Sequence, residues 1–398
     1  MNILFLYERP IIQYMGGVQR VTHVLAEEMQ RRGHNIVYLS TDYERRAGSK
    51  GNNSEGNNSN DTAIKQYFVI YNKNRDVIAK EYYNILKEEK IDIVINQKPH
   101  RDTDYLLSIT PKEIKTISCI HIQPFNTQTY SGQILKHSKS YNWKNTLYLN
   151  VCRLLPWYYK QQERNIEIAR INKALEVSDY LCLLSEHFIP RVLKYMPHID
   201  KNRLIAVNNP AIIENITPQE LVKEKIIIWV GRQSNAQKNV PAFIDVWKIV
   251  SQNNRDWRAV IIGSGSDMEY NKTYAKKNGV ERLEFAGLQK NVEQFYKKAN
   301  FIGMTSTYEG WGMVLTEAMS YGCIPFAYDT YESVHDIIDD GKNGIIVKPF
   351  DKKEMARRIQ EIIDDNEKFA TMQNAALEKV KTFSVENIVD KWEEIFKL

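Results

Sequence analysis

A basic pair follows the apolar run Ile226–Gly231, which has the composition of a buried strand. Arg232 comes directly after this run, and Lys238 lies at the expected start of the next helix. A guanidinium can form two hydrogen bonds to phosphate oxygens, and an ammonium adds a compact positive charge. Because open α/β sheets bind ligands at the carboxyl ends of their strands, Gly231, Arg232 and Lys238 are candidates for binding a diphosphate without a metal. Two solvated surface cations are the alternative interpretation.

Two carboxylates flank a turn that contains two glycines. The turn reads Tyr-Glu-Gly-Trp-Gly, with Glu309 before Gly310 and Gly312, and a helix is expected over about 312–321. Carboxylates accept hydrogen bonds from sugar hydroxyls. We expect Glu309 in the loop and Glu317 in the helix to face one cleft, at different depths. The alternatives are a helix-start carboxylate favoured by the helix dipole for Glu309 and a solvated carboxylate for Glu317.

The first half of the chain holds two further candidates. Gly16 and Gly17 lie between the apolar run Ile3–Tyr7 and a stretch with helical periodicity. Paired glycines at a helix start let backbone N–H groups approach an anion, and the helix dipole favours negative charge there. His121 ends the expected strand Thr116–His121, where it could hydrogen-bond a reacting sugar. A plain tight turn and a structural histidine are the respective alternatives.

Other binding signatures are incomplete in this sequence. Gly263-Ser264-Gly265 lacks the third glycine of a dinucleotide fingerprint, and the phosphate-loop pattern does not occur. Asp-x-Asp, a frequent metal-diphosphate motif, occurs only at Asp102 and Asp104, which begin an expected helix. The four cysteines lie in apolar surroundings without a Cys-x-x-Cys pair, which indicates buried thiols rather than ligands. We therefore expect no metal and no resident cofactor.

Short apolar runs alternate with helical patterns along the chain, which is typical of parallel α/β sheets. The runs of the first half are Ile3–Tyr7, Ile36–Ser40, Ile91–Asn96, Thr116–His121 and Tyr180–Leu184. Those of the second half are Ile226–Gly231, Ala259–Gly263, Phe301–Thr305, Ile324–Tyr328 and Ile345–Val347. A turn-rich stretch from Asn208 to Pro218 separates the two sets. The sequence therefore predicts two domains, 1–211 and 212–384, each with its own sheet.

Two segments of the first domain depart from this alternation. Residues 48–62 are of low complexity and almost without apolar side chains, so a mobile loop is expected. Residues 130–173 contain seven aromatic residues and eight Lys or Arg, against Glu163 and Glu167 alone. Such a segment could seat on anionic lipid headgroups. A helical pair packed on its own domain is the other interpretation, and both can hold together.

Composition bounds the class of protein. The 398 residues are 43% apolar and 26% charged, as in globular proteins of two ordinary domains. The start lacks the features of a signal peptide, and no run reaches the roughly 18 apolar residues of a spanning helix. We therefore expect a cytoplasmic location, with or without contact to the inner face of the cell membrane.

Charge is unevenly distributed along the chain. Residues 1–210 hold 29 Lys and Arg against 21 Asp and Glu, a net charge of +8, and residues 211–398 hold 25 against 28, a net charge of −3. The first half is therefore expected to meet something anionic. Nucleic acid, anionic lipid and diphosphate-linked substrates would all satisfy that requirement.

In this order, these motifs resemble the retaining glycosyltransferases of the group 1 type (family 4), which have the GT-B fold. The resemblance covers nearly the whole chain and is strongest over 225–347. The segments that carry it are IIIWVGRQSNAQKN, VIIGSGSD, LEFAGL, STYEGWGMVLTEAMSYGCIPFAY and DGKNGIIV. It implies an α/β protein of two Rossmann-like domains whose parallel sheets face each other across a cleft. The last helix, at about 385–398, would cross back onto the first domain.

The resemblance also implies roles for residues of the second domain. Arg232 and Lys238 match the basic pair that holds the donor diphosphate. Glu309 matches the acid that contacts hydroxyls of the donor sugar, and Glu317 matches the acid that binds the ribose hydroxyls. The other donor-binding positions that it implies there are Gly231, Gly310, Trp311, Gly312, Met313 and Val314.

Three residues of the first domain would complete this site. Gly16 and Gly17 match the glycine turn that faces the diphosphate, and His121 matches a strand-end histidine near the donor sugar. The catalytic set implied by the resemblance is thus Glu309, His121, Arg232 and Lys238, with no metal.

The implied reaction moves a sugar, with retention of anomeric configuration, from a UDP-, GDP- or ADP-sugar to a saccharide or lipid-linked saccharide. The acceptor would attack from the face that the nucleoside diphosphate leaves, and electrostatic stabilisation of the leaving group would be the main contribution of the protein. Cell-surface polysaccharide or glycolipid biosynthesis is the expected setting, and nucleic acid is not an expected partner. A nucleotide-sugar epimerase on the same fold and a catalytically silent glycan-binding module are the alternatives.

Overall fold

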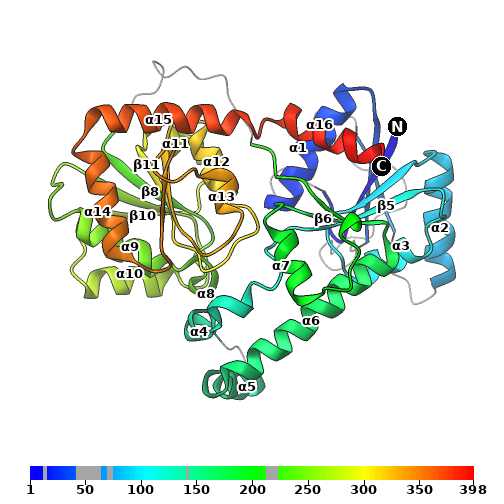
Figure 1. Ribbon diagram of the computed structural model, residues 1–398, viewed down its shortest axis with the longest axis horizontal. Coiled ribbons are helices and arrows are strands. Elements are labelled where there is room, and N and C mark those ends of the chain that lie inside the picture. The colour runs from blue at the N-terminus through cyan, green and yellow to red at the C-terminus, as the bar shows by residue number, and fades with distance from the viewer. Residues whose placement is uncertain (12–15, 42–63, 70–74, 140–142, 212–222) are drawn as a thin grey trace. The chain divides into compact units, whose positions relative to one another are not determined.

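The computed structural model describes residues 1–11, 16–41, 64–69, 75–139, 143–211 and 223–398 (Figure 1). The predicted mobile loop 48–62 lies outside these ranges. The chain divides into two compact units. Unit 1 comprises Met1–Pro124, Ile166–Pro210 and Val385–Leu398, and unit 2 comprises Phe125–Asn165 and Ala211–Ser384. Each unit has its own parallel sheet covered by helices, which confirms the predicted α/β class.

The sheet of unit 1 has the order β3-β2-β1-β4-β5-β6-β7, and all of its strand pairs are parallel. The strands are β1 (Asn2–Tyr7), β2 (Asn35–Ser40), β3 (Lys65–Phe68), β4 (Ile93–Asn96), β5 (Lys115–Ile120), β6 (Tyr180–Leu183) and β7 (Leu204–Ala206). Five of them coincide with predicted runs. Both edge strands escaped prediction, because Lys-Gln-Tyr-Phe is not an apolar run and Leu-Ile-Ala is very short.

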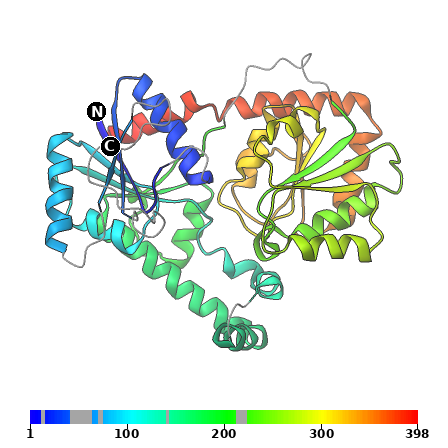
Figure 2. The ribbon, with the colours of Figure 1, turned by 180° about the vertical axis from the view of Figure 1, so that it is seen from behind.

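The helices of unit 1 pack on both faces of this sheet (Figures 1 and 2). They are α1 (Gly17–Arg31), α2 (Arg75–Glu88), α3 (Arg101–Ser108), α7 (Phe188–Tyr195), α16 (Val385–Phe396) and the later part of α6 (Pro156–Val177). The last helix, α16, belongs to unit 1 although unit 2 precedes it in the chain. Lys115 Nζ donates to the Phe396 carbonyl at 2.9 Å, and Arg32 on α1 donates to the Glu386 carbonyl at 2.9 Å.

The sheet of unit 2 has the order β10-β9-β8-β11-β12-β13 and is also parallel throughout. Its strands are β8 (Ile226–Val230), β9 (Arg258–Ile262), β10 (Leu283–Gly287), β11 (Phe301–Met304), β12 (Ile324–Tyr328) and β13 (Ile345–Val347). Continuous apolar runs such as Ile-Ile-Ile-Trp-Val suit strands that helices cover on both faces. Trp229, Trp247 and Phe243 are among the large side chains buried in this core.

Helices cover both faces of the second sheet as well (Figure 2). They are α8 (Asn235–Lys238), α9 (Val240–Val250), α10 (Met268–Lys277), α11 (Glu293–Lys298), α12 (Met313–Met319), α13 (Val334–Ile337), α14 (Lys352–Ile363) and α15 (Asn366–Lys381). No helix in the described ranges combines the length and the apolar character needed to cross a membrane.

The aromatic and basic segment differs from its predicted assignment. Its helices α4 (Thr127–His137) and α5 (Trp143–Leu154) and the start of α6 group with unit 2, whereas the sequence placed them in a domain 1–211. Lys139 forms an ion pair with the buried carboxylate of Asp267, and Tyr130 Oη donates to the Asp329 carbonyl at 3.3 Å. The cationic segment 130–173 thus packs on the half of the chain that has a net negative charge. Its contact partners lie far away in sequence.

Candidate functional site

The centre of the site in unit 2 is an ion pair between Lys238 and Glu309. Lys238 is the last residue of α8, and Glu309 lies in the loop after β11. Lys238 Nζ lies 2.6 Å from Glu309 Oε1, and the two side chains are only 18% and 8% exposed. β8 and β11 are neighbouring parallel strands, so the segments that follow them meet at one edge of the sheet. The structure therefore brings together two candidate residues that the sequence places in separate segments.

Hydrogen bonds between the two segments fix this pair in place. The amide of Thr307 donates to the Gln237 carbonyl at 2.6 Å. Thr305 Oγ1 donates to the Asn239 carbonyl at 3.1 Å. Asn239 has φ 46° and ψ 50°, a left-handed conformation that ends α8 and begins α9. The backbone around Lys238 is thus tied to the loop that carries Glu309.

Arg232 lies beside this pair and remains exposed. Its Nη2 donates to Gln237 Oε1 at 3.3 Å, a long contact that leaves other guanidinium N–H groups for a ligand. Burial raises the pKa of Tyr308 above its ordinary value, the Glu309 carboxylate raises it further, and Arg232 lowers it. Tyr308 is therefore within electrostatic reach of both charges, so Arg232 and Glu309 belong to one polar cluster.

A buried amide network supports the loop that carries Arg232. Asn271 Nδ2 donates to Gln233 Oε1 at 3.0 Å, and Asn235 Nδ2 donates to Asn271 Oδ1 at 2.8 Å. Asp267 Oδ2 accepts from the Asn235 amide at 2.7 Å. Sequence reasoning missed these residues. Their only signal was the polar character of Gln-Ser-Asn next to a buried strand, and their partners lie more than 30 residues away.

The glycines of Gly263-Ser264-Gly265 have a structural role here. A Cβ at Gly263 would lie 2.1 Å from the Gly231 carbonyl oxygen, and one at Gly265 would lie 2.4 Å from the Gln233 carbonyl oxygen. Gly263 also has φ +117°, which side chains rarely allow. The glycines therefore let the loop after β9 lie against the loop after β8. This close approach accounts for the two glycines without any role in binding a dinucleotide.

Glu317 projects from α12, which follows the glycine turn. Its Oε2 accepts a hydrogen bond from Tyr296 Oη at 2.9 Å, and the side chain is half-buried. Gly312 precedes the helix with φ 108°, so the turn requires glycine. Ser333 Oγ donates to the Gly310 carbonyl at 2.9 Å, which fixes the turn from the other side. Glu317 is thus held on α12 by a hydrogen bond from α11.

Trp311 behaves differently from its neighbours in the turn. Its side chain is buried and packs edge-on against Phe383, with ring centroids 5.1 Å apart. The indole therefore packs in the core, and the part of Trp311 left to meet a donor is its backbone. Met313 and Val314 at the helix start are partly exposed, so their backbone N–H groups are the accessible donors of this turn.

The candidates of the first half lie in unit 1. Gly16 has φ 139° and precedes α1, of which Gly17 is the first residue, and both glycines are exposed. The Gly16 carbonyl accepts from the Arg20 amide at 3.0 Å, as in the first turn of a helix. The predicted glycine turn at a helix N-terminus is therefore present, and residues 12–15 before it lie outside the described ranges.

His121 follows β5 and is held by Gln97, which follows the neighbouring strand β4. His121 Nε2 lies 2.8 Å from Gln97 Oε1, and burial lowers the pKa of His121 to about 4. The imidazole is therefore neutral near pH 7, with Nε2 donating to the amide oxygen. Nδ1 is buried and has no hydrogen-bond partner among the described residues, so it can accept from a ligand hydroxyl. Sequence reasoning missed Gln97, which orients this ring.

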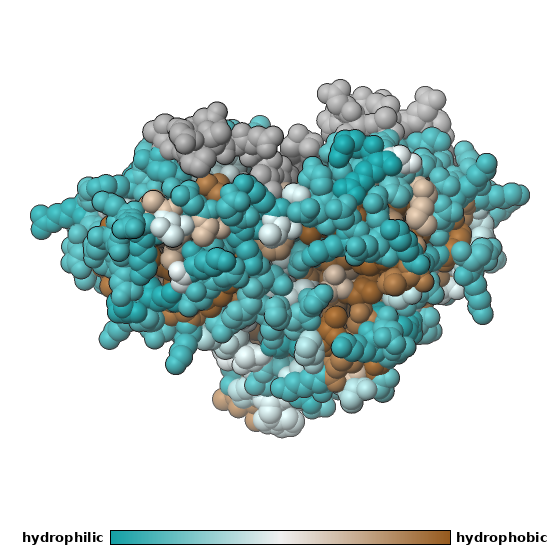
Figure 3. Space-filling model, turned by 45° about the horizontal axis from the view of Figure 1, so that its top comes forward, coloured by the Kyte–Doolittle hydropathy of each residue, from teal (hydrophilic) through white to brown (hydrophobic). Residues whose placement is uncertain are grey.

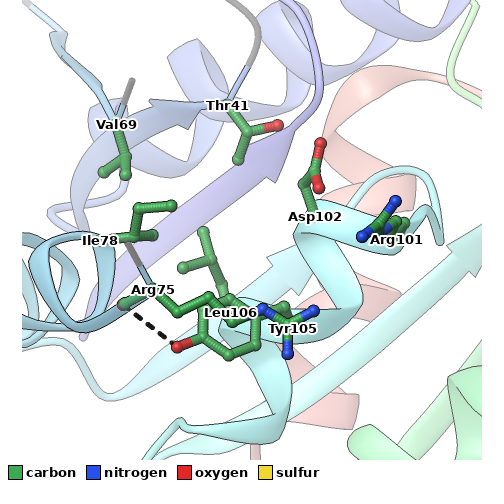
Figure 4. A pocket seen from close by; sticks show the side chains of 8 residues that line it. All are labelled: Thr41, Val69, Arg75, Ile78, Arg101, Asp102, Tyr105 and Leu106. Atoms are coloured by element: carbon green, nitrogen blue, oxygen red, sulfur yellow. Dashed lines mark hydrogen bonds between the residues drawn. The ribbon is translucent and has the colours of Figure 1, made fainter. Parts of the chain in front are cut away.

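Unit 1 also contains a small pocket of about 20 Å³ beside β2 and α3 (Figure 4). Its apolar floor includes Ile78 and Leu106, and Arg75, Arg101 and Asp102 supply charge. The complete lining is Thr41, Val69, Arg75, Ile78, Arg101, Asp102, Tyr105 and Leu106. A space of this size holds about one water molecule, far less than an ordinary ligand pocket.

The two carboxylates of Asp-x-Asp do not form a metal-binding pair. Asp102 lines the pocket, whereas Asp104 is buried, and that burial raises the pKa of Asp104 to about 6. Across the described ranges, no group of three or more His, Cys, Asp or Glu side chains is arranged to hold a metal ion.

Two family profiles match the chain. Residues 15–158 match the profile described as glycosyltransferase family 4, and residues 213–379 match that of glycosyl transferases group 1. An uncharacterized glycosyltransferase of Haemophilus influenzae is 21% identical over 381 residues, which are 96% of each chain. The lipopolysaccharide 1,6-galactosyltransferase of Salmonella typhimurium is 32% identical over 159 residues, 38% of this chain and 44% of the relative.

The fold is also similar to that of a solved glycosyltransferase structure. A TarM variant of S. aureus, crystallised with fondaparinux, alpha-GlcNAc-glycerol and UDP, gives a TM-score of 0.71 at 15% identity, with each chain covered completely. This likeness supports the GT-B fold. The two profile matches together span more than three quarters of the chain, and the chain thus belongs to the group 1 glycosyltransferases of family 4.

Proposed function

We propose that this glycosyltransferase moves a sugar from a nucleoside-diphosphate sugar to a saccharide or lipid-linked saccharide, with retention of anomeric configuration. The observation that carries the proposal is the Lys238–Glu309 ion pair beside the exposed guanidinium of Arg232. The two cations Arg232 and Lys238 and the carboxylate of Glu309 lie at one edge of the sheet, and they match the two chemical parts of such a donor. The cations suit its diphosphate, and the carboxylate suits its hydroxyl groups.

In this proposal, the bond between the anomeric carbon and the diphosphate oxygen breaks, and the diphosphate leaves with the electron pair. Arg232 and Lys238 offset the charge that develops on it. The acceptor hydroxyl forms the new bond on the same face, and its proton passes to a phosphate oxygen of the leaving group. This route requires no covalent nucleophile and no metal.

Glu309 has a second task in the proposed reaction. It holds Lys238 before any ligand is bound, so the ammonium is oriented without the donor. Its remaining oxygen lone pairs can accept a hydrogen bond from a donor-sugar hydroxyl. Glu317, held by Tyr296, is proposed to accept from the ribose hydroxyls. Neutral His121 would accept from a sugar hydroxyl through Nδ1 when the donor is bound.

The comparisons suggest the setting of the reaction. The TarM structure contains UDP, which makes UDP the first nucleotide to test. The Salmonella relative is named for a reaction on lipopolysaccharide. We infer that the acceptor here is a cell-surface polysaccharide or glycolipid intermediate.

A donor screen followed by a transfer assay tests the proposal. UDP, GDP, ADP and their sugars are added to the protein, and the unfolding temperature is measured, because a bound donor stabilises the folded state. Transfer is then measured for Arg232→Ala, Lys238→Ala and Glu309→Ala, each expected to lower kcat by about 100-fold or more. Lys272→Ala, which removes a cation paired with Glu269 on α10, is the matched control.

The products distinguish the competing activities. Retention predicts that NMR of the product shows the anomeric configuration of the donor. An epimerase would change the nucleotide sugar without any acceptor, and a silent binding module would bind glycan without turnover of any donor. Full transfer activity in all three site variants would contradict the site assignment.

A further inference from the structure

Helix α5 presents an apolar stripe to solvent. Trp143, Leu147 and Leu154 are 72%, 60% and 80% exposed. Their spacing places them within about 40° of one another around the helix axis. Leu155 and Trp157 continue the exposure past the helix end. We call these five residues the outer face of α5. An amphipathic helix on a protein surface normally turns its apolar stripe toward the core. In α5, the apolar stripe faces solvent instead.

The opposite side of α5 holds the helix in place. Cys152 is its only buried residue among those described, and it packs with Leu135 of α4 and Tyr159 of α6. Arg153 Nε donates to the Leu135 carbonyl at 3.1 Å, and its Nη2 donates to the Ser138 carbonyl at 2.9 Å. The exposed orientation is therefore fixed by contacts within unit 2. In Figures 1 and 2, no other ribbon of unit 2 lies beyond α5 on this side.

The outer face is an unusual concentration of exposed apolar side chains. Six of the thirteen large hydrophobic side chains that are exposed in the described part of the chain lie within 143–157. Most of the surface drawn in Figure 3 is hydrophilic, although brown atoms lie in several places on it, its lower end among them. Contiguous exposed apolar side chains of this kind mark surfaces that bind a partner or a membrane.

The segment that carries the outer face is cationic up to residue 162, and Glu163 is the first acidic residue after it. Residues 114–162 contain no Asp or Glu, whereas Lys136, Lys144, Arg153 and Lys160 lie on or beside the three helices. The ammonium of Lys144 lies 5.6 Å from the centre of the Trp143 ring. Tryptophan beside lysine is well suited to the interface between headgroups and acyl chains, where the ring is half in each phase.

We propose that the outer face of α5 docks on an anionic lipid surface. Trp143, Leu147, Leu154 and their neighbours would enter the boundary between headgroups and acyl chains, and the lysines would meet the headgroup phosphates. A second copy of the chain fits this face less well. Pairing the face with itself would bring Lys144 of each copy together, with no acidic side chain in 114–162 to offset the charge.

Docking there would place the donor site near the lipid. The α4 helix of the same segment packs on unit 2 through Tyr130 and Lys139. Asp267, which pairs with Lys139, also accepts from the amide of Asn235 in α8, the helix that ends at Lys238. The lipid-binding face and the diphosphate-binding loop thus belong to one unit, which suits an acceptor carried by lipid.

Flotation with vesicles tests the proposal without any measurement of sugar transfer. The vesicles contain phosphatidylcholine alone or with roughly one third phosphatidylglycerol. The wild-type chain is expected to float with the anionic vesicles, and the triple variant Trp143→Ser, Leu147→Ser, Leu154→Ser is expected to bind about 100-fold more weakly. Lys144→Glu is expected to reduce binding to the anionic vesicles about tenfold.

The matched control is Leu288→Ser, because Leu288 is 79% exposed in unit 2 but lies outside α5. It is expected to float like the wild type. All variants change exposed side chains, so their unfolding temperatures should match that of the wild type. Equal flotation of the triple variant, or no flotation of the wild type, would overturn the proposal. A concentration-dependent dimer that the triple variant abolishes, without vesicle binding, would assign the face to a second copy instead.

Discussion

The Lys238–Glu309 pair allows a quantitative test of the site. Lys238→Ala removes the ion-pair partner that the Glu309 carboxylate has among the described residues, and that carboxylate is only 8% exposed. Breaking a buried ion pair by removing one partner costs about 3–5 kcal/mol. Because Lys238 is 18% exposed and the pair lies at a sheet edge, we expect the lower end, about 3 kcal/mol of unfolding free energy. Glu309→Ala should cost a similar amount, since it leaves the ammonium unpaired.

A double-mutant cycle separates this pair from general damage. Lys238→Ala combined with Glu309→Ala removes both charges, so it should be about as stable as either single variant, which corresponds to a coupling free energy of about 2–3 kcal/mol. Urea unfolding of the four proteins at neutral pH gives this value. Losses that simply add, with a coupling below about 0.5 kcal/mol, would refute the claim that the pair is formed.

The ligand arm of the same cycle tests the role of Lys238. A nucleoside diphosphate at about 100 times its Kd should add about 2.7 kcal/mol to the unfolding free energy of the wild-type chain. The same concentration should add much less to Lys238→Ala. Equal stabilisation of both proteins would show that the ammonium does not contact the diphosphate, even if the ion pair itself is real.

Three further perturbations follow from the structure. Gly263→Ala places a methyl group 2.1 Å from the Gly231 carbonyl oxygen, so donor affinity should fall at least tenfold in a titration. Gly132 lies in α4 with open space around it, so Gly132→Ala should stabilise the fold by about 0.5–1 kcal/mol. The pKa of His121 is lowered to about 4, so the unfolding free energy should fall by up to about 3 kcal/mol between pH 6.5 and 4, and His121→Asn should lack that loss. Burial raises the pKa of Asp104 to about 6, so its contribution to stability declines as pH rises from about 4 to 6, and Asp104→Asn should unfold at a higher temperature than wild type at pH 7.

Sequence reasoning succeeded where one segment carries its own signal. The continuous apolar runs of β1, β8 and β12 predicted buried parallel strands, because both faces of such strands are covered. It failed for β10, whose Leu-Glu-Phe-Ala-Gly has a charged second residue and lies at the edge of the sheet. An edge strand needs less apolar character, so composition does not distinguish it from a loop.

The placement of α4 and α5 could not be predicted for a different reason. The domain boundary was inferred from chain order and turn composition, which assign a segment to the neighbours that precede and follow it. The contacts that hold this segment join Lys139 to Asp267 and Tyr130 to Asp329. Residues so far apart in sequence carry no local signal that they are in contact. The opposite net charges of the two halves are consistent with such contacts but do not identify them.

The glycines of unit 2 show which part of the motif serves the ligand. Gly231, Gly310 and Gly312 are all predicted donor-binding positions, and the sequence suggests that Gly310 and Gly312 free the backbone to approach a ligand. In the structure, Gly312 supplies a left-handed conformation before α12, and the loop at Gly231 is the surface against which Gly263 packs. These glycines are therefore required by the scaffold before any ligand arrives. Of the two cations proposed to meet the diphosphate, Lys238 is paired with Glu309, whereas among the described residues Arg232 makes only a long hydrogen bond to Gln237. A substitution there should alter donor binding while leaving the fold intact, whereas a substitution at Gly263 should alter both.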